Sequence, residues 1–171
     1  SRLLGNSVVS SEAPRRAQDG SDGQDGQDAA ATPGPLGDLR VIDVSTVVAG
    51  PGCARYLADF GAEVIKVERP DGGDTTRTMG WVDPRDDVTL WWKLAGRGKR
   101  VVALDLKSTG GRDAFLRLCA TADVLVENFR PGTLERLGLG PEVLHERRPS
   151  LVVTRVTGFG QEGPYAGRPG F

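Results

Sequence analysis

Basic and amide side chains follow several short apolar segments of the sequence. Arg69, Lys107 and Asn128 each come within three residues of such a segment's end, and Arg136 lies a little further along. Guanidinium and ammonium groups bind phosphate oxygens, and an amide near an aromatic ring such as Phe129 suits a purine base. If the apolar segments are parallel strands, these side chains lie along one edge of one sheet. The pattern then predicts a site for a phosphorylated ligand.

The segments that must position these residues alternate in character. Short β-branched, apolar runs predict strands, and the stretches between them have the apolar spacing and end residues of helices. The predicted strands are residues 40–44, 64–67, 101–104, 124–126 and 151–154, and the predicted helices are 51–61, 108–119, 133–137 and 141–147. The alternation predicts an α/β fold with a Rossmann-like, mostly parallel sheet covered by helices on both faces.

The long connection at 69–98 and the loops after the strands are where ligands are expected. The loops that follow the predicted strands are 45–52, 68–75, 105–109, 127–132 and 155–165. Gly50-Pro51-Gly52 with Glu68 loosely resembles a dinucleotide-binding fingerprint, but Arg55 stands where its third glycine belongs. An oxidoreductase that uses a nicotinamide or flavin cofactor is therefore an alternative.

Composition excludes several classes of partner. The chain has 171 residues, 22 Lys+Arg against 23 Asp+Glu and a net charge of −1, which gives no bulk attraction to nucleic acid or to an anionic membrane. No apolar run approaches the length of a membrane span. With one histidine, His145, and two separated cysteines, Cys53 and Cys119, we expect no metal site, no disulfide framework and a cytoplasmic location.

The first 34 residues differ from the rest. Residues 19–28 repeat small, acidic and amide residues with nothing apolar to bury. Such a segment cannot offset the entropy cost of ordering, so residues 1–34 are predicted to be a disordered acidic, Gly/Asp-rich tail. The folded part is predicted to begin at residue 35.

Six motifs follow one another between residues 35 and 171. They read PLGDLRVID at 35–43, AGP at 49–51, LADFGAEVIKVERP at 57–70, KRVVALDLK at 99–107, ENFRPG at 127–132 and GFGQEGPY at 158–165. In this order they resemble the class III CoA-transferase superfamily, which includes formyl-CoA transferase, carnitine CoA-transferase and α-methylacyl-CoA racemase. Residues 35–171 then correspond to the N-terminal part of the family's large domain, so that domain is incomplete in this chain.

The resemblance implies a ligand, substrates and a quaternary structure. The ligand is coenzyme A, the substrates are a CoA thioester and a carboxylic acid, and the full-length protein is expected to form an interlocked homodimer. The positions that match the family's CoA contacts are Val48, Ala49, Arg69, Leu104, Asp105, Leu106, Lys107, Asn128, Phe129, Arg130 and Arg136.

The resemblance also implies a catalytic aspartate that this chain does not contain. The family's transferases use an Asp nucleophile, and its matching position lies a few tens of residues beyond Phe171. We therefore expect the 171-residue chain alone to be inactive.

Racemases of the superfamily carry a proton-transferring His at the position of Phe171, whose phenyl ring cannot exchange a proton. A racemase-like isomerase and a non-catalytic CoA-binding remnant remain alternatives to the transferase.

Overall fold

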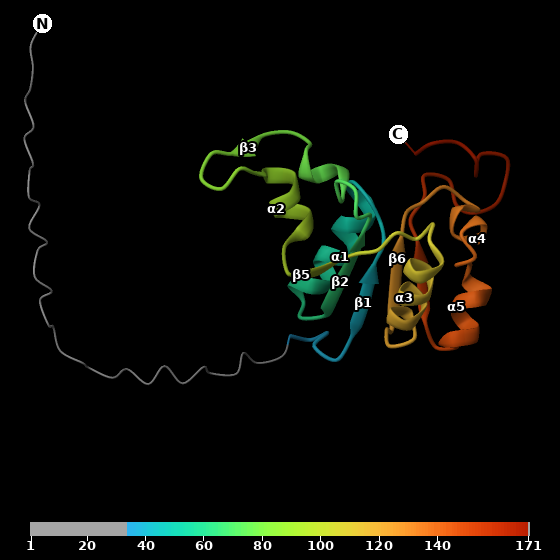
Figure 1. Cartoon of the computed structure of the whole chain (residues 1–171). Coiled ribbons are helices and arrows are strands. Elements are labelled where there is room, and N and C mark those ends of the chain that lie inside the picture. Colours follow the sequence, from blue (N-terminus) through green and yellow to red (C-terminus); the bar gives the residue numbers. More distant parts are fainter. Residues whose placement is uncertain (1–33, 171) are drawn as a thin grey trace, which may run out of the picture. The chain divides into compact units, whose positions relative to one another are not determined.

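The computed structural model describes residues 34–170, so the predicted N-terminal tail lies, but for its last residue, outside the described residues. Five strands form one parallel sheet in the order β5-β2-β1-β6-β7 (Figure 1). Their bounds are β1 Arg40–Asp43, β2 Glu63–Glu68, β5 Lys99–Ala103, β6 Val124–Glu127 and β7 Val152–Arg155. The order reverses between β1 and β6, because the chain builds outward from β1 to β5 and then returns to the other side of β1.

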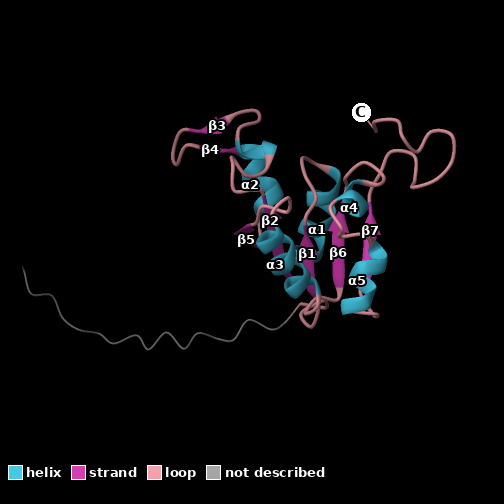
Figure 2. Cartoon of the chain, turned by 45° about the vertical axis from the view of Figure 1, so that its right-hand side comes forward, coloured by secondary structure: helices cyan, strands magenta, loops and turns pink. Residues whose placement is uncertain are grey.

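Helices cover both faces of this sheet, as the sequence predicted (Figure 2). Successive side chains of a strand point to opposite faces. Val41 of β1 therefore packs with Ala54 of α1 (Ala49–Asp59), whereas Ile42 packs on the other side with Phe115 of α3 (Thr109–Cys119) and Leu144 of α5 (Pro141–Arg147). The one-turn helix α4 (Thr133–Arg136) joins the second of these cores.

The connection between β2 and β5 holds more structure than the sequence predicted. It contains a 3₁₀ turn η1 (Thr75–Arg77), an antiparallel hairpin of β3 (Val82–Asp83) and β4 (Val88–Thr89), and helix α2 (Leu90–Gly96). Strands of two residues show no periodicity, so the sequence predicted only a long connection. The buried Asp83 carboxylate of β3 forms ion pairs with Arg85 at 2.6 Å and with Lys93 of α2.

The start of α3 brings the loop after β5 into a tight turn. Ser108 caps the helix, with its hydroxyl accepting a hydrogen bond from the Gly111 amide at 3.0 Å. A Cβ atom at Gly111 would overlap the carbonyl oxygen of Asp105, so only glycine lets the loop lie this close to the helix. Within residues 34–170 no helix is long and apolar enough to cross a membrane.

Replacing Leu125 by Ala should lower the free energy of unfolding by about 3 kcal/mol, because this β6 side chain is fully buried in the core. Leu90→Ala is the matched control. Leu90 is 51% exposed at the start of α2, so its truncation should change the free energy of unfolding by less than about 0.5 kcal/mol. Urea denaturation of both variants measures the difference. Equal losses would contradict the position of β6 inside the sheet.

Candidate ligand-binding site

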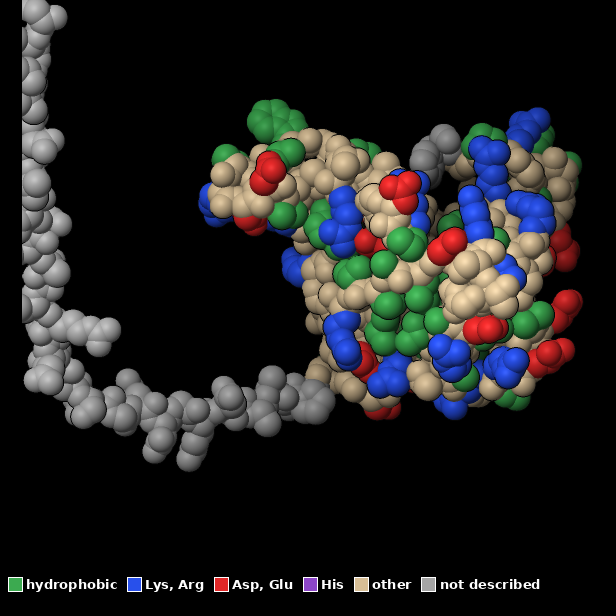
Figure 3. All heavy atoms as spheres, viewed as in Figure 1, with side chains coloured by type: hydrophobic (Ala, Val, Ile, Leu, Met, Phe, Trp, Pro, Cys, Tyr) green, Lys and Arg blue, Asp and Glu red, His purple; other side chains and the backbone are tan. Residues whose placement is uncertain are grey.

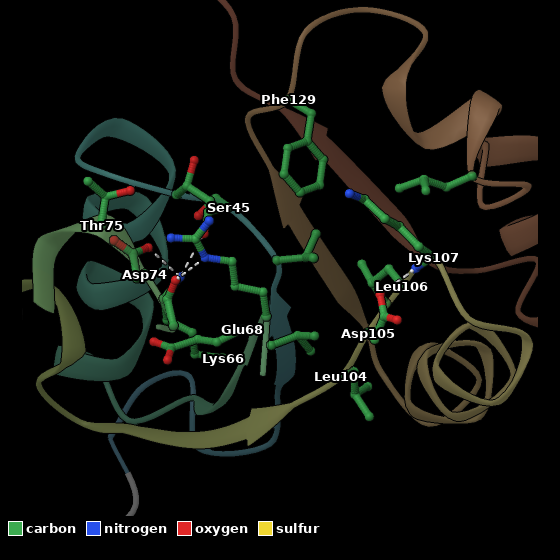
Figure 4. A pocket seen from close by; sticks show the side chains of 16 residues that line it. Ser45, Lys66, Glu68, Asp74, Thr75, Leu104, Asp105, Leu106, Lys107 and Phe129 are labelled. Atoms are coloured by element: carbon green, nitrogen blue, oxygen red, sulfur yellow. Dashed lines mark hydrogen bonds and ion pairs between the residues drawn. The ribbon is translucent and has the colours of Figure 1, made fainter. Parts of the chain in front are cut away.

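A pocket of about 270 Å³ opens beyond the carboxyl ends of β1, β2 and β5 (Figure 4). It lies beside the point where the strand order reverses, which is the usual ligand position in doubly wound sheets. Three of the loops singled out from the sequence contribute most of its lining, which comprises Val44, Ser45, Thr46, Lys66, Val67, Glu68, Arg69, Gly73, Asp74, Thr75, Leu104, Asp105, Leu106, Lys107, Phe129 and Leu137. The space-filling view shows a hollow at the top of the molecule, with both basic and acidic side chains around it (Figure 3).

Beneath this pocket two carboxylates and two ammonium groups are buried together. Asp43 Oδ2 lies 2.8 Å from Lys99 Nζ and 3.7 Å from Lys66 Nζ, and Lys66 Nζ lies 3.2 Å from Asp74 Oδ2. All four side chains are at most 1% exposed. The two negative and two positive charges balance, which is the condition for burying charges at tolerable cost. We call these four residues the buried charge cluster.

The protonation of the buried charge cluster follows from its contacts. Burial raises the pKa of the Asp74 carboxyl, but two hydrogen bonds from Thr76 and the Lys66 ammonium outweigh it, so the net pKa lies below the usual 3.8. For Lys99 burial prevails and lowers the pKa of its ammonium group, although Asp43 opposes this shift. Asp74 is therefore held ionised.

Arg69 is held over the pocket by a glycine turn. Its Nε donates to the carbonyl of Gly73 at 2.9 Å, and its terminal nitrogens make no hydrogen bond with the residues that the structure describes. Gly73 has a φ of +64°, and a Cβ atom there would lie 2.5 Å from the Glu68 carboxylate. Glu68 in turn accepts from Arg77 Nε at 2.8 Å, and that guanidinium stacks on the Trp92 ring at 3.6 Å. This chain of contacts leaves the end of Arg69 available to a ligand.

Lys107 and Phe129 lie on the other side of the pocket, and the Lys107 side chain extends toward the Phe129 ring (Figure 4). No ion pair of Lys107 occurs among residues 34–170, so its charge is also available. Phe129 is positioned from its own backbone, because its amide donates to the buried Glu127 carboxylate at 2.7 Å. The other oxygen of Glu127 accepts from Arg155 Nε at 2.7 Å, which ties the loop after β6 to β7.

A second pocket of about 320 Å³ adjoins the first and shares Thr46 and Phe129 with it. It is lined by Thr46, Val47, Ala49, Asn128, Phe129, Arg130, Pro131, Val156, Thr157, Gly158, Ala166, Arg168, Pro169 and Gly170. No acidic residue is in this set, and neither Arg130 nor Arg168 forms an ion pair within the described part of the chain. Two adjoining pockets with cations in their linings suit an elongated ligand with anionic groups.

The two pockets account for most of the residues selected from the sequence. Arg69, Lys107 and Leu104–Leu106 line the first pocket, Ala49, Asn128 and Arg130 line the second, and Phe129 lines both. Val48 instead faces a third, apolar pocket between α1 and α2.

Arg136 lines neither of the first two pockets, and one of its guanidinium nitrogens donates to Thr133 Oγ1 at 2.9 Å. The next residue, Leu137, does line the first pocket.

Asn128, which the sequence offered as a base-binding amide, forms hydrogen bonds with protein backbone. Its Oδ1 accepts from the Thr46 amide at 2.7 Å, and its Nδ2 donates to the Thr46 carbonyl at 2.8 Å. Both ends of the side-chain amide are therefore bound to protein backbone.

Sequence reasoning also missed Lys66 and Asp74 as a buried pair. The available signal was a lysine inside the apolar run of β2, at Ile65-Lys66-Val67.

The histidine and the two cysteines line neither the first nor the second pocket. His145 is exposed on α5, and its Nε2 lies 3.0 Å from the Leu151 carbonyl. Cys119 is fully buried, and burial raises the pKa of its thiol to about 12. Cys53 is partly buried on α1, and burial raises its pKa as well. Among residues 34–170 no group of three or more His, Cys, Asp or Glu side chains is arranged to hold a metal ion.

These features define a doubly wound α/β domain with a pocket at its strand-order switch that carries the exposed cations Arg69 and Lys107. Comparison with known proteins then gives the family. Residues 36–171 match the sequence profile of CoA-transferase family III, and the chain belongs to this family.

Two curated relatives show how much of such proteins the chain represents. The succinyl-CoA–L-malate CoA-transferase beta subunit of Chloroflexus aurantiacus is 53% identical over 137 residues, which are 80% of this chain and 34% of the relative. The succinate–glutarate CoA-transferase of Agrobacterium fabrum is 44% identical over 142 residues, which are 80% of this chain and 36% of the relative. The chain thus spans about a third of the length of these proteins.

Solved structures agree with the fold. A CAIB/BAIF family protein from Brucella suis matches with a TM-score of 0.76 and 40% identity, over 82% of this chain and 38% of that one. Rv3272 from Mycobacterium tuberculosis matches with a TM-score of 0.73 and 43% identity, over 81% of this chain and 38% of that one. The family resemblance and the parallel α/β sheet predicted from the sequence are both confirmed.

We expect Asp74→Asn to remove part of the acid sensitivity of folding. Since the pKa of Asp74 is lowered in the folded state, its ionised form stabilises the fold fully above the usual 3.8, and this stabilisation is lost as the pH falls through the lower folded-state value. Asn cannot titrate, so the free energy of unfolding should fall less steeply than in wild type between about pH 5 and pH 2. At neutral pH the variant should be less stable by about 3 kcal/mol, because Lys66 loses a buried partner.

Urea denaturation at several pH values measures both effects. Asp113→Asn, which removes an exposed carboxylate on α3, shows how much of the change comes from net charge alone. Parallel curves for wild type and Asp74→Asn would contradict the buried ion pair.

Proposed function

We propose that this chain is the CoA-binding, N-terminal portion of a CoA-transferase that moves coenzyme A from a CoA thioester to a carboxylic acid. The observation that carries the proposal is the pair of adjoining pockets with available cations at the switch of the sheet. Coenzyme A is long, with phosphates at one end and a thiol at the other. Arg69 and Lys107 suit its phosphates, with Arg136 close by beside Leu137. Residues 46–49 and 128–130 line the way to the second pocket, where the thioester end would lie.

In the proposed reaction an Asp beyond Phe171 is the nucleophile. It attacks the acyl carbon of the thioester, which releases CoA thiolate and forms an acyl-aspartyl anhydride. CoA thiolate then attacks the aspartyl carbonyl, which forms an aspartyl-CoA thioester and releases the first carboxylate. The second carboxylate displaces CoA to form a new anhydride, and attack of CoA on its acyl carbon gives the product thioester and frees the Asp. Such covalent steps divide one difficult transfer into easier ones. The residues of this chain hold CoA and orient its thiol toward that carboxylate. This assignment is supported by the family membership of residues 36–171 and by the names of the two curated relatives described above, both of which are CoA-transferases.

We further propose that the acid is a dicarboxylic acid. Malate and glutarate, in the names of two relatives, each carry two carboxylates. A second carboxylate needs a cationic partner. Arg130 and Arg168 line a pocket without acidic residues, and the Arg168 guanidinium already lies over the Tyr165 ring at 4.2 Å.

The full-length protein is proposed to act as an interlocked homodimer in the cytoplasm. Large apolar side chains support an interface, since Trp81 is 84% exposed and Tyr56, Trp91 and Leu94 lie on the surface around α1 and α2. Cys53 and Cys119 are unpaired thiols, as expected in a reducing compartment.

In the full-length protein, Arg69→Ala should weaken CoA binding by about tenfold or more, because one charge-assisted contact to phosphate is lost. Arg100→Ala is the matched control. Arg100 is exposed near the amino end of β5, where it pairs with Glu63 at 2.8 Å, so its loss should change affinity by less than about twofold. Titration calorimetry with CoA measures both, and equal affinities of Arg69→Ala and wild type would refute the proposed phosphate site.

Incubating the full-length protein with succinyl-CoA should yield a covalent protein–CoA thioester that hydroxylamine cleaves. Intact-mass spectrometry would show the added mass of CoA, and free CoA in place of succinyl-CoA should give no adduct. The 171-residue chain should give no adduct either, since it lacks the proposed Asp. An adduct on that chain would place the nucleophile within residues 1–171 and refute this part of the proposal.

A further inference from the structure

The loop between β1 and α1 contains a backbone conformation that its residue disfavours. Val47 has a φ of +67°, in the left-handed region that β-branched residues avoid. The loop is also where the pockets meet, because Thr46 lines the first and second pockets and Val47 the second and third. A strained residue at such a place persists only if its surroundings hold it there.

Asn128 provides the closest restraint. It comes from the loop after β6, and its side-chain amide pairs with both the N–H and the C=O of Thr46, the residue before Val47, at 2.7 and 2.8 Å. The Thr46 N–H belongs to the peptide unit before this residue and its C=O to the peptide unit after it, so Asn128 restrains the orientation of both units. These two bonds commit one N–H and one oxygen lone pair of the amide to the protein backbone.

The two lysines of the buried charge cluster hold the ends of the same loop. Lys66 Nζ donates to the Ser45 carbonyl at 2.6 Å, on the amino side of Val47. Lys99 Nζ donates to the Pro51 carbonyl at 2.7 Å, in the first turn of α1. The loop is therefore restrained at Ser45, Thr46 and Pro51, and the strained residue lies between these points.

We infer that Asn128 is a positioning residue, which acts on CoA through the backbone of Thr46 and Val47 instead of by contact with its base. This inference rests on the proposed CoA site. By holding Val47 in the left-handed region, Asn128 keeps Val48 and Ala49 in place at the entrance of α1, where the proposed ligand passes from the first pocket to the second. The loop is thus formed before the ligand arrives, and binding does not have to order it.

The test compares three variants of the full-length protein by titration with CoA and by thermal unfolding. Asn128→Ala should weaken CoA binding by about tenfold or more. Asp123→Ala is the matched control, because Asp123 also joins β6 to β1 through backbone, accepting from the Arg40 amide at 2.9 Å, but at the amino end of both strands. It should lower the melting temperature without changing CoA affinity by more than about twofold.

The third variant adds Val47→Gly to Asn128→Ala. Glycine adopts a φ of about +67° without strain, so the double variant should recover at least half of the lost affinity, measured in log units. A direct contact between Asn128 and CoA predicts no recovery, and that result would overturn the inference. So would an equal loss of affinity in Asp123→Ala. If wild type itself does not bind CoA, the proposed function fails, which is a distinct result.

Discussion

The buried charge cluster is the constraint on which the rest of the site depends. Asp43, Lys66 and Lys99 come from three neighbouring strands, and Asp74 comes from the connection after β2. An unpaired charge at these depths would cost several kcal/mol, so each member is stable only while the others are in place. Folding of the central strands, the start of α1 and the residues before η1 is therefore coupled. Replacing the cluster with apolar residues would keep a core but lose the donors that hold the loop after β1.

The site combines two kinds of group, which are exposed cations and a loop held by buried side chains. Arg69 and Lys107 are exposed cations on flexible stems, and they suit the attraction and holding of phosphates. The loop from Ser45 to Pro51 is held by buried groups and carries strain at Val47, which costs about 1–3 kcal/mol of folding stability. Such a cost is tolerated where geometry must be set in advance.

The extent to which the sequence predicted this structure follows from the range of the interactions involved. Continuous β-branched runs such as Val41-Ile42 specify a strand locally, so the sheet and its covering helices could be predicted, together with the loops that form the pockets. The buried charge cluster could not, because Asp74 lies in a connection without periodicity and its partner Lys66 is recognisable only once β2 is known to be covered on both faces. The hydrogen bonds of Asn128 could not be predicted either, because its partner is backbone from a loop 82 positions away, and backbone partners leave no signature in the side-chain pattern.

In this fold, different groups set the affinity for a ligand and the alignment of that ligand in the pockets. In a doubly wound sheet the loops after β1 and β6 are brought side by side by the reversal of strand order, whatever their sequences. The amino-acid sequence determines which hydrogen bonds form between these two loops. Here the junction between Thr46 and Asn128 is closed by hydrogen bonds within the protein, and the cations that suit an anion lie away from it on the rims of the pockets. A ligand that spans both pockets therefore contacts cations at its ends and a fixed backbone at its middle. This arrangement favours one alignment of a long, flexible molecule over the many conformations that it adopts in water.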